Sequence, residues 1–445
     1  MTRVSVGAVV LNYNGGDVTM QCLRSLLVTS RTDEELRVVL VDNASRDGIA
    51  SRVRHELPAV EVIDSSSNRG FAGGCNLGIR ALGRQDYVAL VNSDAFVEPE
   101  WLTPLVRTLE DDKGLGAACP KILFAGRYAE VTIDAPSRRW GRGDRRELGV
   151  LMTGARVNGD DAWPRAQHVS GFWGLEPSEL RHQGQWTTPR AGLRLPVPSM
   201  GRARGELRLA AVDRVGVTLS SGKERAEVQV GPTPTWYDVP LTEPRVAVVN
   251  NVGTQLDSGG YGSDRGYLEP EDGRFDCPGE VFAWCGAATL LRREYLEDVG
   301  LFDERLFLYY EDLELAWRGR RLGWRYQYVP ESRVHHLHAS STGEGSALKR
   351  YFDERNHSLL LTRHAPGVVA VSARLRYLKA TGSYAIRDLV APVLRGRLPR
   401  PAIVRQRLGA FGGYLLRLPA MLATRLKDRR RGLQPPRQSW PGIPS

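Results

Sequence analysis

The N-terminal part of the chain repeats one pattern, in which a short apolar run is followed by polar residues and then by apolar positions at helical spacing. The apolar runs lack polar alternation, which is typical of strands buried on both faces of a parallel sheet. These runs are residues 4–11, 37–41, 60–63 and 87–91. Helical periodicity is found in residues 17–27, in residues 47–56 and in the stretch after Cys75. Repetition of strand, polar loop and helix predicts a doubly wound α/β sheet.

The strand expected at residues 87–91 leads directly into Asn92, Ser93 and Asp94. Ligands of open α/β sheets bind outside the carboxyl ends of the strands, so these side chains are expected at the rim of a cleft. A carboxylate there suits Mg²⁺ or Mn²⁺ shared with a diphosphate, because hard divalent ions prefer oxygen ligands. From these residues alone, the alternative is that Asp94 only begins a turn.

Two more polar loops follow expected strands, with Asn12, Tyr13 and Asn14 after the first and Asp42 after the second. A glycine-rich segment, residues 70–74, precedes the helix expected from about Cys75. Backbone N–H groups at such a place can hold a phosphate, although glycines required only for a tight turn give the same pattern. The segment matches neither G-x-G-x-x-G nor a Walker A sequence, which argues against dinucleotide-binding and P-loop functions.

Residues 125–245 have a different pattern, with short runs that alternate apolar and polar positions between Gly, Pro and Ser. Short strands at this spacing predict an antiparallel β-sandwich, and the core pattern resumes at Val246, as expected for a domain inserted in a loop. The insert is rich in aromatic residues, which either form a carbohydrate-stacking face or belong to its core.

Beyond residue 366 the chain is basic and helical in pattern. Three helices are expected in residues 367–433, and Pro392 and Pro419 are expected to end or kink the second and third. Basic amphipathic helices either lie on an anionic membrane surface or pack on a neighbouring domain with their charges in water. Residues 434–445, rich in Pro, Ser and Gly, are expected to be disordered.

Composition narrows the possible environments and partners. The chain has 445 residues, a net charge of +10 and a sequence pI near 9.5, which favours an anionic partner. No apolar run has the length of a membrane span and no signal peptide is recognised, so a cytoplasmic protein is expected. The five cysteines are scattered, which argues against a disulfide framework and a zinc site.

Several motifs in order resemble the family-2 glycosyltransferases of GT-A fold. The resemblance is closest to the bacterial rhamnosyltransferase-like and galactofuranosyltransferase-like branch, and it covers about residues 1–124 and 246–366. It rests on the Asn-Tyr-Asn at 12–14, Asp-Asn-Ala-Ser at 42–45, Asn-Arg-Gly-Phe-Ala at 68–72, Asn-Ser-Asp at 92–94, and the stretches 302–318 and 334–341. The implied fold is a GT-A doubly wound, Rossmann-like mixed sheet with the inserted sandwich and a helical tail. Residues 1–124 then form a nucleotide-sugar-binding half and residues 246–366 an acceptor-binding half.

The resemblance implies a donor site at the rim of the sheet. Asp42 is expected to hold the nucleotide base, Asn68 and Arg69 to lie near base or diphosphate, and Asp94 to hold the metal. The other implied substrate-binding residues on this side are Asn12, Tyr13, Asn14, Asn92 and Ser93. Asn92 stands where the family usually has the first aspartate of Asp-x-Asp, which leaves one carboxylate for the metal.

The resemblance places the chemistry at Glu311 and Asp312. An inverting transfer requires a base that removes the acceptor hydroxyl's proton, and a helix start is a suitable place for a carboxylate. Asp312 is the expected base, and Glu311 is expected to position the acceptor. The residues by themselves favour a pair that only caps the helix carrying Leu315 and Trp317.

Three further features have a functional and a structural interpretation. Of His335, His336 and His338, the resemblance favours His336 as second metal ligand. Arg318 either meets the diphosphate or forms an ion pair with Glu314. The segment containing Trp284 and Gly286 forms the acceptor-side wall, or Trp284 is a core residue.

The expected function is a metal-dependent inverting glycosyltransferase that uses Mn²⁺ or Mg²⁺. Its donor is a nucleoside diphosphate sugar, and its acceptor a cell-envelope polysaccharide or lipid-linked glycan at the inner face of the membrane, which the basic tail contacts. The alternative is a non-catalytic glycan-binding or scaffold protein on the same fold. Charge alone suggests nucleic acid, but no binding motif supports that partner.

Overall fold

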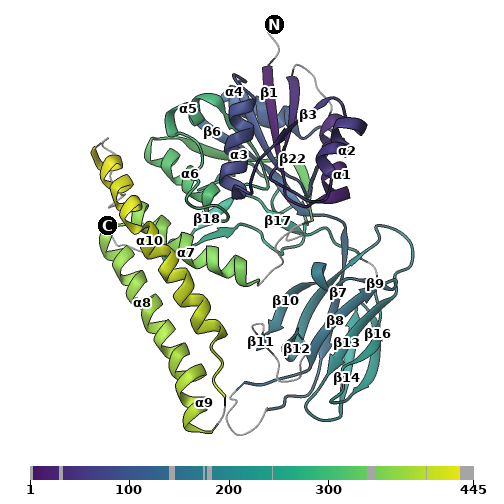
Figure 1. Cartoon of the computed structure of the whole chain (residues 1–445). Helices are drawn as coiled ribbons and strands as arrows, with labels where there is room; N and C mark the ends of the chain where they lie inside the picture. Colours follow the sequence, from purple (N-terminus) through teal and green to yellow (C-terminus); the bar gives the residue numbers. More distant parts are fainter. Residues whose placement is uncertain are drawn as a thin grey trace. The chain divides into compact units, whose positions relative to one another are not determined.

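The computed structural model describes residues 4–29, 34–139, 146–173, 176–177, 183–242, 244–337, 346–396 and 398–430. The chain forms two compact units (Figure 1). Unit 1 consists of residues 1–122, 251–266 and 275–445, and unit 2 consists of residues 123–250 and 267–274. The second unit therefore interrupts the sequence of the first. Residues 434–445, expected to be disordered, lie outside the described residues.

Unit 1 contains one large sheet, a small hairpin and most of the helices. The strands of the sheet are β1 (Val4–Asn12), β2 (Glu34–Asp42), β3 (Val60–Asp64), β4 (Tyr87–Asn92), β5 (Ala95–Val97), β6 (Leu115–Phe124), β17 (Val249–Asn251), β20 (Gly279–Glu280), β21 (Ala288–Arg292) and β22 (Arg325–His336). The hairpin is β18 (Thr254–Leu256) with β19 (Gly262–Asp264). The helices are α1 (Gly16–Leu27), α2 (Ile49–Glu56), α3 (Gly70–Ala81), α4 (Leu102–Asp111), α5 (Arg293–Val299), α6 (Glu311–Arg321), α7 (Ala347–His364), α8 (Gly367–Ala385), α9 (Ala391–Leu394) and α10 (Ala402–Arg430).

The sheet of unit 1 is mixed, in the order β20-β22-β6-β21-β4-β1-β2-β3. Strands β1 to β4 run parallel, and β21 is antiparallel to β4 and to β6. Each parallel strand ends at the same edge, because Asn12 is paired with Asp42 and Leu11 with Asn92. The polar residues that follow these strands in the sequence are therefore collected at one rim.

Both faces of the parallel strands are covered by helices, which explains their unbroken apolar runs. Val6, Ala8 and Val10 of β1 belong to a core shared with α1, α2 and α4. On the opposite face, α3 approaches β1 so closely that a Cβ at Gly78 would lie 2.5 Å from Val9 Cγ1. Helix α3 begins at Gly70, so residues 70–74 lie in its first turns, not in a loop before it.

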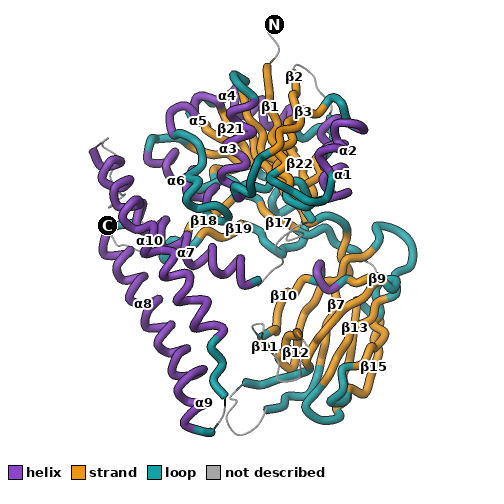
Figure 2. Tube along the Cα trace, viewed as in Figure 1, coloured by secondary structure: helices purple, strands orange, loops and turns teal. Residues whose placement is uncertain are grey.

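Unit 2 is antiparallel, with strand order β15-β14-β7-β12-β8-β13-β16 (Figure 2). Its strands are β7 (Arg127–Asp134), β8 (Leu151–Val157), β9 (Asp160–Asp161), β10 (Gln167–Phe172), β11 (Glu176–Pro177), β12 (Gln183–Val197), β13 (Gly205–Ala210), β14 (Val215–Ser221), β15 (Glu224–Val230) and β16 (Thr235–Val239). The long strand β12 pairs with β7 near its end and with β8 near its start, so it belongs to the layer that contains β7 and to the layer that contains β8. The inward side chains of these two layers form one core, as expected for a sandwich.

The C-terminal helices are part of unit 1 and pack on α7, with α7, α8 and α10 in mutual contact (Figure 2). A Cβ at Gly413 of α10 would lie 2.3 Å from Tyr351 Oη of α7, so this crossing requires glycine. Buried Asp428 of α10 accepts from Arg363 Nε of α7 at 2.9 Å. Helix α10 runs through Pro419 without ending there, because tertiary packing outweighs the missing N–H.

The predicted fold class, a mixed α/β sheet with an antiparallel insertion and a helical C-terminal region, is confirmed. Within the described residues, no helix has the length and apolar character required to span a membrane.

Candidate active site

Asn12 organises the rim where β1 and β2 end. Its buried Nδ2 donates to Asp42 Oδ1 at 3.1 Å and to Ser45 Oγ at 2.8 Å. Its Oδ1 accepts from Gly15 N at 3.0 Å and Thr19 Oγ1 at 2.8 Å. Asn12 therefore uses its amide to orient Asp42, not to meet a ligand directly. Tyr13 and Asn14 are exposed beside it.

Asn43, which the sequence analysis did not single out, joins this rim to the loop before α3. Its buried Nδ2 lies 3.0 Å from Asn68 Oδ1 and 3.1 Å from Gly70 O. Its Oδ1 accepts from Arg69 N at 2.8 Å. The side chains of Asn68 and Arg69 are exposed next to Asp42, and every polar atom of Asn43 has a partner. The signal for Asn43 is its place directly after Asp42.

Asp94 and His336 meet at the end of β4. His336 Nε2 lies 3.1 Å from Asp94 Oδ1, and both side chains are largely buried. The pairing of β5 with β22, in which His336 lies opposite Ala95, brings them together. His335 points elsewhere, with Nε2 2.8 Å from Glu98 Oε1, and His338 lies outside the described residues. Asn92 and Ser93 are half-buried in the turn before Asp94.

The Asp94 and His336 donors fit a shared divalent ion. Adjacent ligands of an octahedral ion with bonds of about 2.1 Å are about 3 Å apart, and these atoms are 3.1 Å apart. A carboxylate oxygen and an imidazole nitrogen suit Mn²⁺. No cluster of three or more acidic, His or Cys side chains suited to a metal is found in the described ranges.

Asp312 is held at the start of α6. Its Oδ2 accepts from Gly286 N at 2.9 Å and its Oδ1 from Leu313 N at 2.7 Å. Burial raises the pKa of this carboxyl and Asp264 adds to the rise, while the N–H groups oppose it. A fixed carboxylate with a raised pKa is a stronger base than an exposed one.

Glu311, beside it, is almost completely buried, and its Oε2 has no hydrogen-bond partner. Burial raises its pKa well above the ordinary value, and the charge of Asp312 adds to the rise. Burial therefore favours the protonated form of Glu311, while Asp312 is the carboxyl with fixed acceptor geometry.

The loop before α6 has a strained backbone, because Phe307, Tyr309 and Tyr310 all have positive φ, at 67°, 65° and 70°. Buried Asn356 of α7 holds this loop, with Nδ2 at 2.9 Å from Leu306 O and 2.7 Å from Tyr309 O. The loop leads directly into Glu311 and Asp312. Asn356 therefore positions the pair from a distant part of the sequence, and local sequence offers no signal for it.

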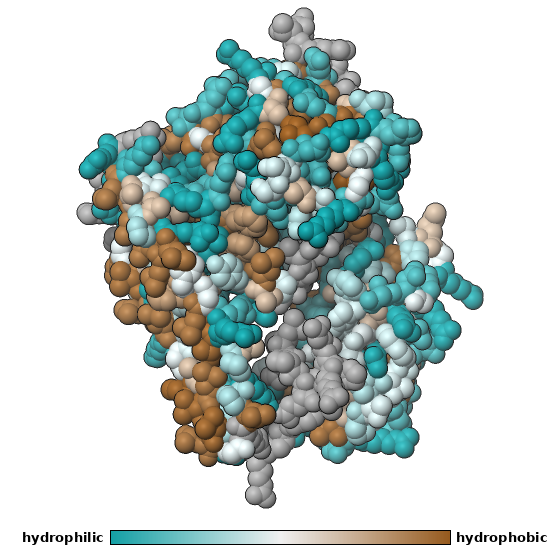
Figure 3. Space-filling view, viewed as in Figure 1, coloured by the Kyte–Doolittle hydropathy of each residue, from teal (hydrophilic) through white to brown (hydrophobic). Residues whose placement is uncertain are grey.

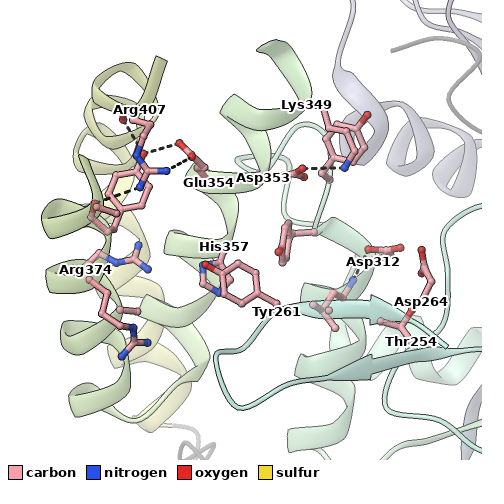
Figure 4. Close-up of a pocket in the computed structure, with 18 residues that line it drawn as sticks. Thr254, Tyr261, Asp264, Asp312, Lys349, Asp353, Glu354, His357, Arg374 and Arg407 are labelled. Carbon is pink, nitrogen blue, oxygen red and sulfur yellow. Dashed lines mark hydrogen bonds and ion pairs between the residues drawn. The ribbon is translucent and has the colours of Figure 1, made fainter. Parts of the chain in front are cut away.

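Asp312 opens onto a pocket of about 600 Å³ within unit 1. The β18–β19 hairpin contributes Tyr261 and Asp264, and helices α7, α8 and α10 form the opposite wall. Figure 4 shows Tyr261 and His357 between Asp312 and Asp264 on one side and Arg374 on the other. The Tyr261 and His357 rings stack at 3.8 Å, and Tyr261 remains 52% exposed.

Two family sequence patterns match this chain. "Glycosyl transferase family 2" matches residues 8–148, and "Glycosyltransferase like family 2" matches residues 276–356. These matches contain Asp42, Asp94 and Asp312. The chain belongs to glycosyltransferase family 2.

Curated relatives share a shorter segment with this family-2 glycosyltransferase. The N-acetylglucosaminyl-diphospho-decaprenol L-rhamnosyltransferase of Mycobacterium tuberculosis, strains CDC 1551 / Oshkosh and ATCC 25618 / H37Rv, is 45% identical over 62 residues. That segment is 14% of this chain and 20% of the relative.

Solved structures resemble the glycosyltransferase more distantly. GalNAc-T7 with UDP, GalNAc and Mn²⁺ has a TM-score of 0.48 at 12% identity, covering 98% of this chain and 59% of that one. The mannosyltransferase PcManGT from Pyrobaculum calidifontis, in complex with GDP-Man and Mn²⁺, has a TM-score of 0.39 at 14% identity, covering 97% and 75%. TarS 1–349 of S. aureus has 0.39 at 12% identity, covering 96% and 92%.

Two residues expected to bind substrate in this glycosyltransferase are structural. Trp284 is fully buried and packs edge to face against Phe302, so it offers no ring face to a sugar. Arg318 donates to Glu314 Oε2 at 2.9 Å and to two backbone carbonyls, which keeps it away from a diphosphate.

The aromatic side chain that is exposed in the pocket is Tyr261, whereas Trp284 is buried. Asp257 Oδ1 accepts from Gly259 N and Tyr261 N, both at 2.8 Å, and this turn projects the ring. Gly286 serves the site through its N–H to Asp312. The sequence analysis missed Tyr261, Asp264 and His357 because they lie on a hairpin and a helix outside the recognised motifs.

Proposed function

We propose that this family-2 protein is a metal-dependent inverting glycosyltransferase. It moves a sugar from a nucleoside diphosphate to a hydroxyl group of a cell-envelope polysaccharide or lipid-linked glycan. The observation that carries the proposal is Asp312, a half-buried carboxylate of raised pKa held by two N–H groups at the edge of a pocket that fits an acceptor sugar. The name of the mycobacterial relative, which describes a transfer to a diphospholipid-linked sugar, supports the acceptor class.

The donor is assigned to the rim formed by the ends of β1, β2 and β4. Asp42, oriented by Asn12, accepts hydrogen bonds from the nucleotide base, and exposed Asn68 and Arg69 meet the base or diphosphate. Asp94 and His336 would hold Mn²⁺ or Mg²⁺. A divalent ion bound there would neutralise negative charge on the leaving diphosphate.

Asp312 takes the proton of the acceptor hydroxyl as its oxygen attacks the anomeric carbon. The bond from that carbon to the diphosphate breaks in the same displacement, and the diphosphate leaves with the electron pair. Attack from the face opposite the leaving group inverts the anomeric configuration. Burial of the neighbouring Glu311 favours its protonated form, which keeps a second negative charge away from the base.

We also propose that the C-terminal helices contact the inner face of the cell membrane, where a lipid-linked acceptor would be found. They expose many large apolar side chains, which gather over these helices at the lower left of Figure 3. Those on α8, α9 and α10 with the segment between α8 and α9 are Val368, Val371, Leu375, Leu378, Ile386, Val390, Val393, Leu394, Leu408, Leu415, Leu416, Leu422 and Leu426. Exposed apolar surface of this extent is typical of an interaction site.

The proposed function is tested by product analysis. Purified full-length chain is incubated with Mn²⁺, a panel of nucleoside diphosphate sugars and a dodecyl-diphosphate-linked N-acetylglucosamine acceptor, and products are analysed by mass spectrometry and NMR. We expect one donor to give a glycosylated acceptor of inverted anomeric configuration. Retention of configuration, or no product from any donor while nucleotides still bind, contradicts the proposed reaction and favours the non-catalytic alternative.

A further inference from the structure

In the pocket beside Asp312, two acidic side chains lie at one end and two basic side chains lie at the other. Eight charged side chains line it, and four of them neutralise each other in pairs. Lys349 Nζ lies 2.9 Å from Asp353 Oδ2, and Arg407 Nη1 lies 2.7 Å from Glu354 Oε1. Asp264 and Asp312 remain at one end, and Arg374 and Arg376 of α8 at the other.

The α8 arginine pair, Arg374 and Arg376, has no carboxylate partner among the residues that the structure describes. Arg374 Nε and Nη1 are buried without any hydrogen-bond acceptor, and its guanidinium lies 5.2 Å from the centre of the Tyr414 ring. Arg376 is exposed and donates only to Ser372 Oγ at 3.3 Å. A partly buried guanidinium without an acceptor is costly, so an anion at this end of the pocket would be stabilised.

Burial lowers the pKa of Arg374, and the neighbouring charge of Arg376 contributes to the shift. Burial also lowers the pKa of His357 to about 4, with Arg374 contributing, so this ring is neutral at pH 7. The charge available to a ligand at this end is therefore that of the two arginines. A diester of diphosphoric acid, with one negative charge on each phosphate, matches a charge of +2.

The order of groups across the pocket matches a sugar bearing a diphosphate. Figure 4 shows the exposed Tyr261 ring between Asp312 and Arg374. A sugar ring stacked on Tyr261 presents a hydroxyl toward Asp312 and its own anomeric substituent toward α8. We propose that the α8 arginine pair is the binding site for the diphosphate of a glycosyl diphosphate acceptor. This inference rests on the proposed function and assigns the acceptor's anionic end to residues outside the family motifs.

The test is a binding measurement without donor, metal or turnover. Full-length protein in EDTA is titrated by calorimetry with three probes that share N-acetylglucosamine: its dodecyl diphosphate, its methyl diphosphate and its neutral dodecyl glycoside. We expect the diphosphates to bind at least tenfold more tightly than a neutral glycoside with the same sugar. A preference for the dodecyl over the methyl diphosphate identifies a lipid-borne acceptor, and equal affinities identify a water-soluble one. Both results support the site.

Arg376→Gln and Arg374→Gln should each lower diphosphate affinity about tenfold while leaving the affinity for the neutral glycoside unchanged. Arg376 is exposed, so its variant is expected to fold even if the Arg374 variant does not. Lys379→Gln is the matched control, because Lys379 is exposed on the same helix but does not line the pocket. Added salt should weaken diphosphate binding in the wild type and less so in the variants.

Equal affinity for charged and neutral probes overturns the inference, as does unchanged diphosphate binding by Arg376→Gln. Equal losses in Lys379→Gln and Arg376→Gln also overturn it, because they show a general charge effect. Because none of these results depends on nucleotide binding, the proposed transferase function stands or fails separately in the donor experiments.

Discussion

The proposed donor rim and the proposed acceptor pocket belong to the same unit, and their polar side chains differ in whether they have hydrogen-bond partners. At the rim, every side-chain polar atom of Asn12 and Asn43 has a partner. In the pocket, Arg374 has buried polar atoms without a partner, and so has Glu311, which precedes the pocket-lining Asp312 in the sequence. The rim is thus a rigid frame that presents exposed side chains, whereas the pocket stores unsatisfied groups that a substrate can complete.

This difference suggests where each kind of substitution acts. A change in a satisfied network removes stability, because buried partners are left unpaired. A change at an unsatisfied group alters chemistry or binding and costs little stability.

The largest effect is expected for Asp312→Asn, which keeps the shape of the site and removes the base. We predict that kcat falls by about 10²–10⁴-fold, while the affinity for the donor nucleotide is unchanged. Turnover is measured with the donor identified by product analysis. Asp111→Asn, an exposed change at the end of α4, is the control and should keep full activity. Wild-type kcat in the Asp312 variant would exclude this residue as base.

A smaller effect, on stability as well as activity, is expected for Asn356→Ala. The substitution removes the side-chain donor of the Leu308 and Tyr309 carbonyls and releases the strained loop before α6, so we predict a loss of about 2–4 kcal/mol in the free energy of unfolding. Chemical denaturation measures it. Gln406→Ala, which removes an exposed hydrogen bond to Arg350 between α10 and α7, should cost less than about 0.5 kcal/mol. Equal costs would show that Asn356 does not hold the loop.

At the rim, Asn43→Ala should cost about 1–3 kcal/mol, because it leaves Arg69 N without its acceptor and removes a donor from Gly70 O. Nucleotide affinity should fall as well, since the loop carrying Asn68 is no longer anchored. Urea unfolding and nucleotide titration are the two measurements. Gln85→Ala is a comparable amide removal away from the rim, and a matching loss of nucleotide affinity there would contradict the assignment.

The smallest effect near neutral pH is expected for Glu311→Gln, a neutral isostere of the protonated carboxyl that burial favours. The folded-state pKa of Glu311 is raised, so the folded state binds more protons than the unfolded state above the ordinary value near 4.5. Its contribution to stability therefore falls as pH rises, by at most about 1.4 kcal/mol per pH unit. The variant should show a flatter stability profile between pH 5 and pH 9. Identical slopes for variant and wild type would mean that Glu311 is ionised.

The parts of the molecule that sequence predicts best are those specified locally. Side-chain periodicity predicts the buried strand at residues 87–91, which is β4 in the structure. It also predicts the alternating strands of the insert, which form the sheet of unit 2. Residues 70–74 were expected to precede the helix, because a run of glycines resembles a loop, but they belong to α3. The close approach of Gly78 to Val9 shows that α3 requires glycine where it packs on β1. Pro419 was expected to end or kink the third C-terminal helix. It does not end α10, because contacts of α10 with α7 outweigh a local helix breaker.

The candidate site was predictable only where motifs mark it. Asp42, Asp94, His336 and Asp312 follow from the family pattern, and the structure brings Asp94 to His336 across a long sequence separation. Trp284 and Arg318 look like binding residues in sequence, but burial and backbone partners assign them to the framework. Tyr261 and Arg374 were not predictable, because their proximity depends on how α7 and α8 pack on a hairpin.

The measurement that tests the central claim most directly is thermal stabilisation by nucleoside diphosphates and their sugars. It is made with and without Mn²⁺ on the wild type and on Asp94→Ala. A ligand that binds only the native state stabilises it by about 2.7 kcal/mol at a concentration of 100 Kd. The account predicts that one base gives a shift that requires Mn²⁺ and disappears in the variant. No shift with any nucleotide, or an equal metal-dependent shift in Asp94→Ala, would contradict it.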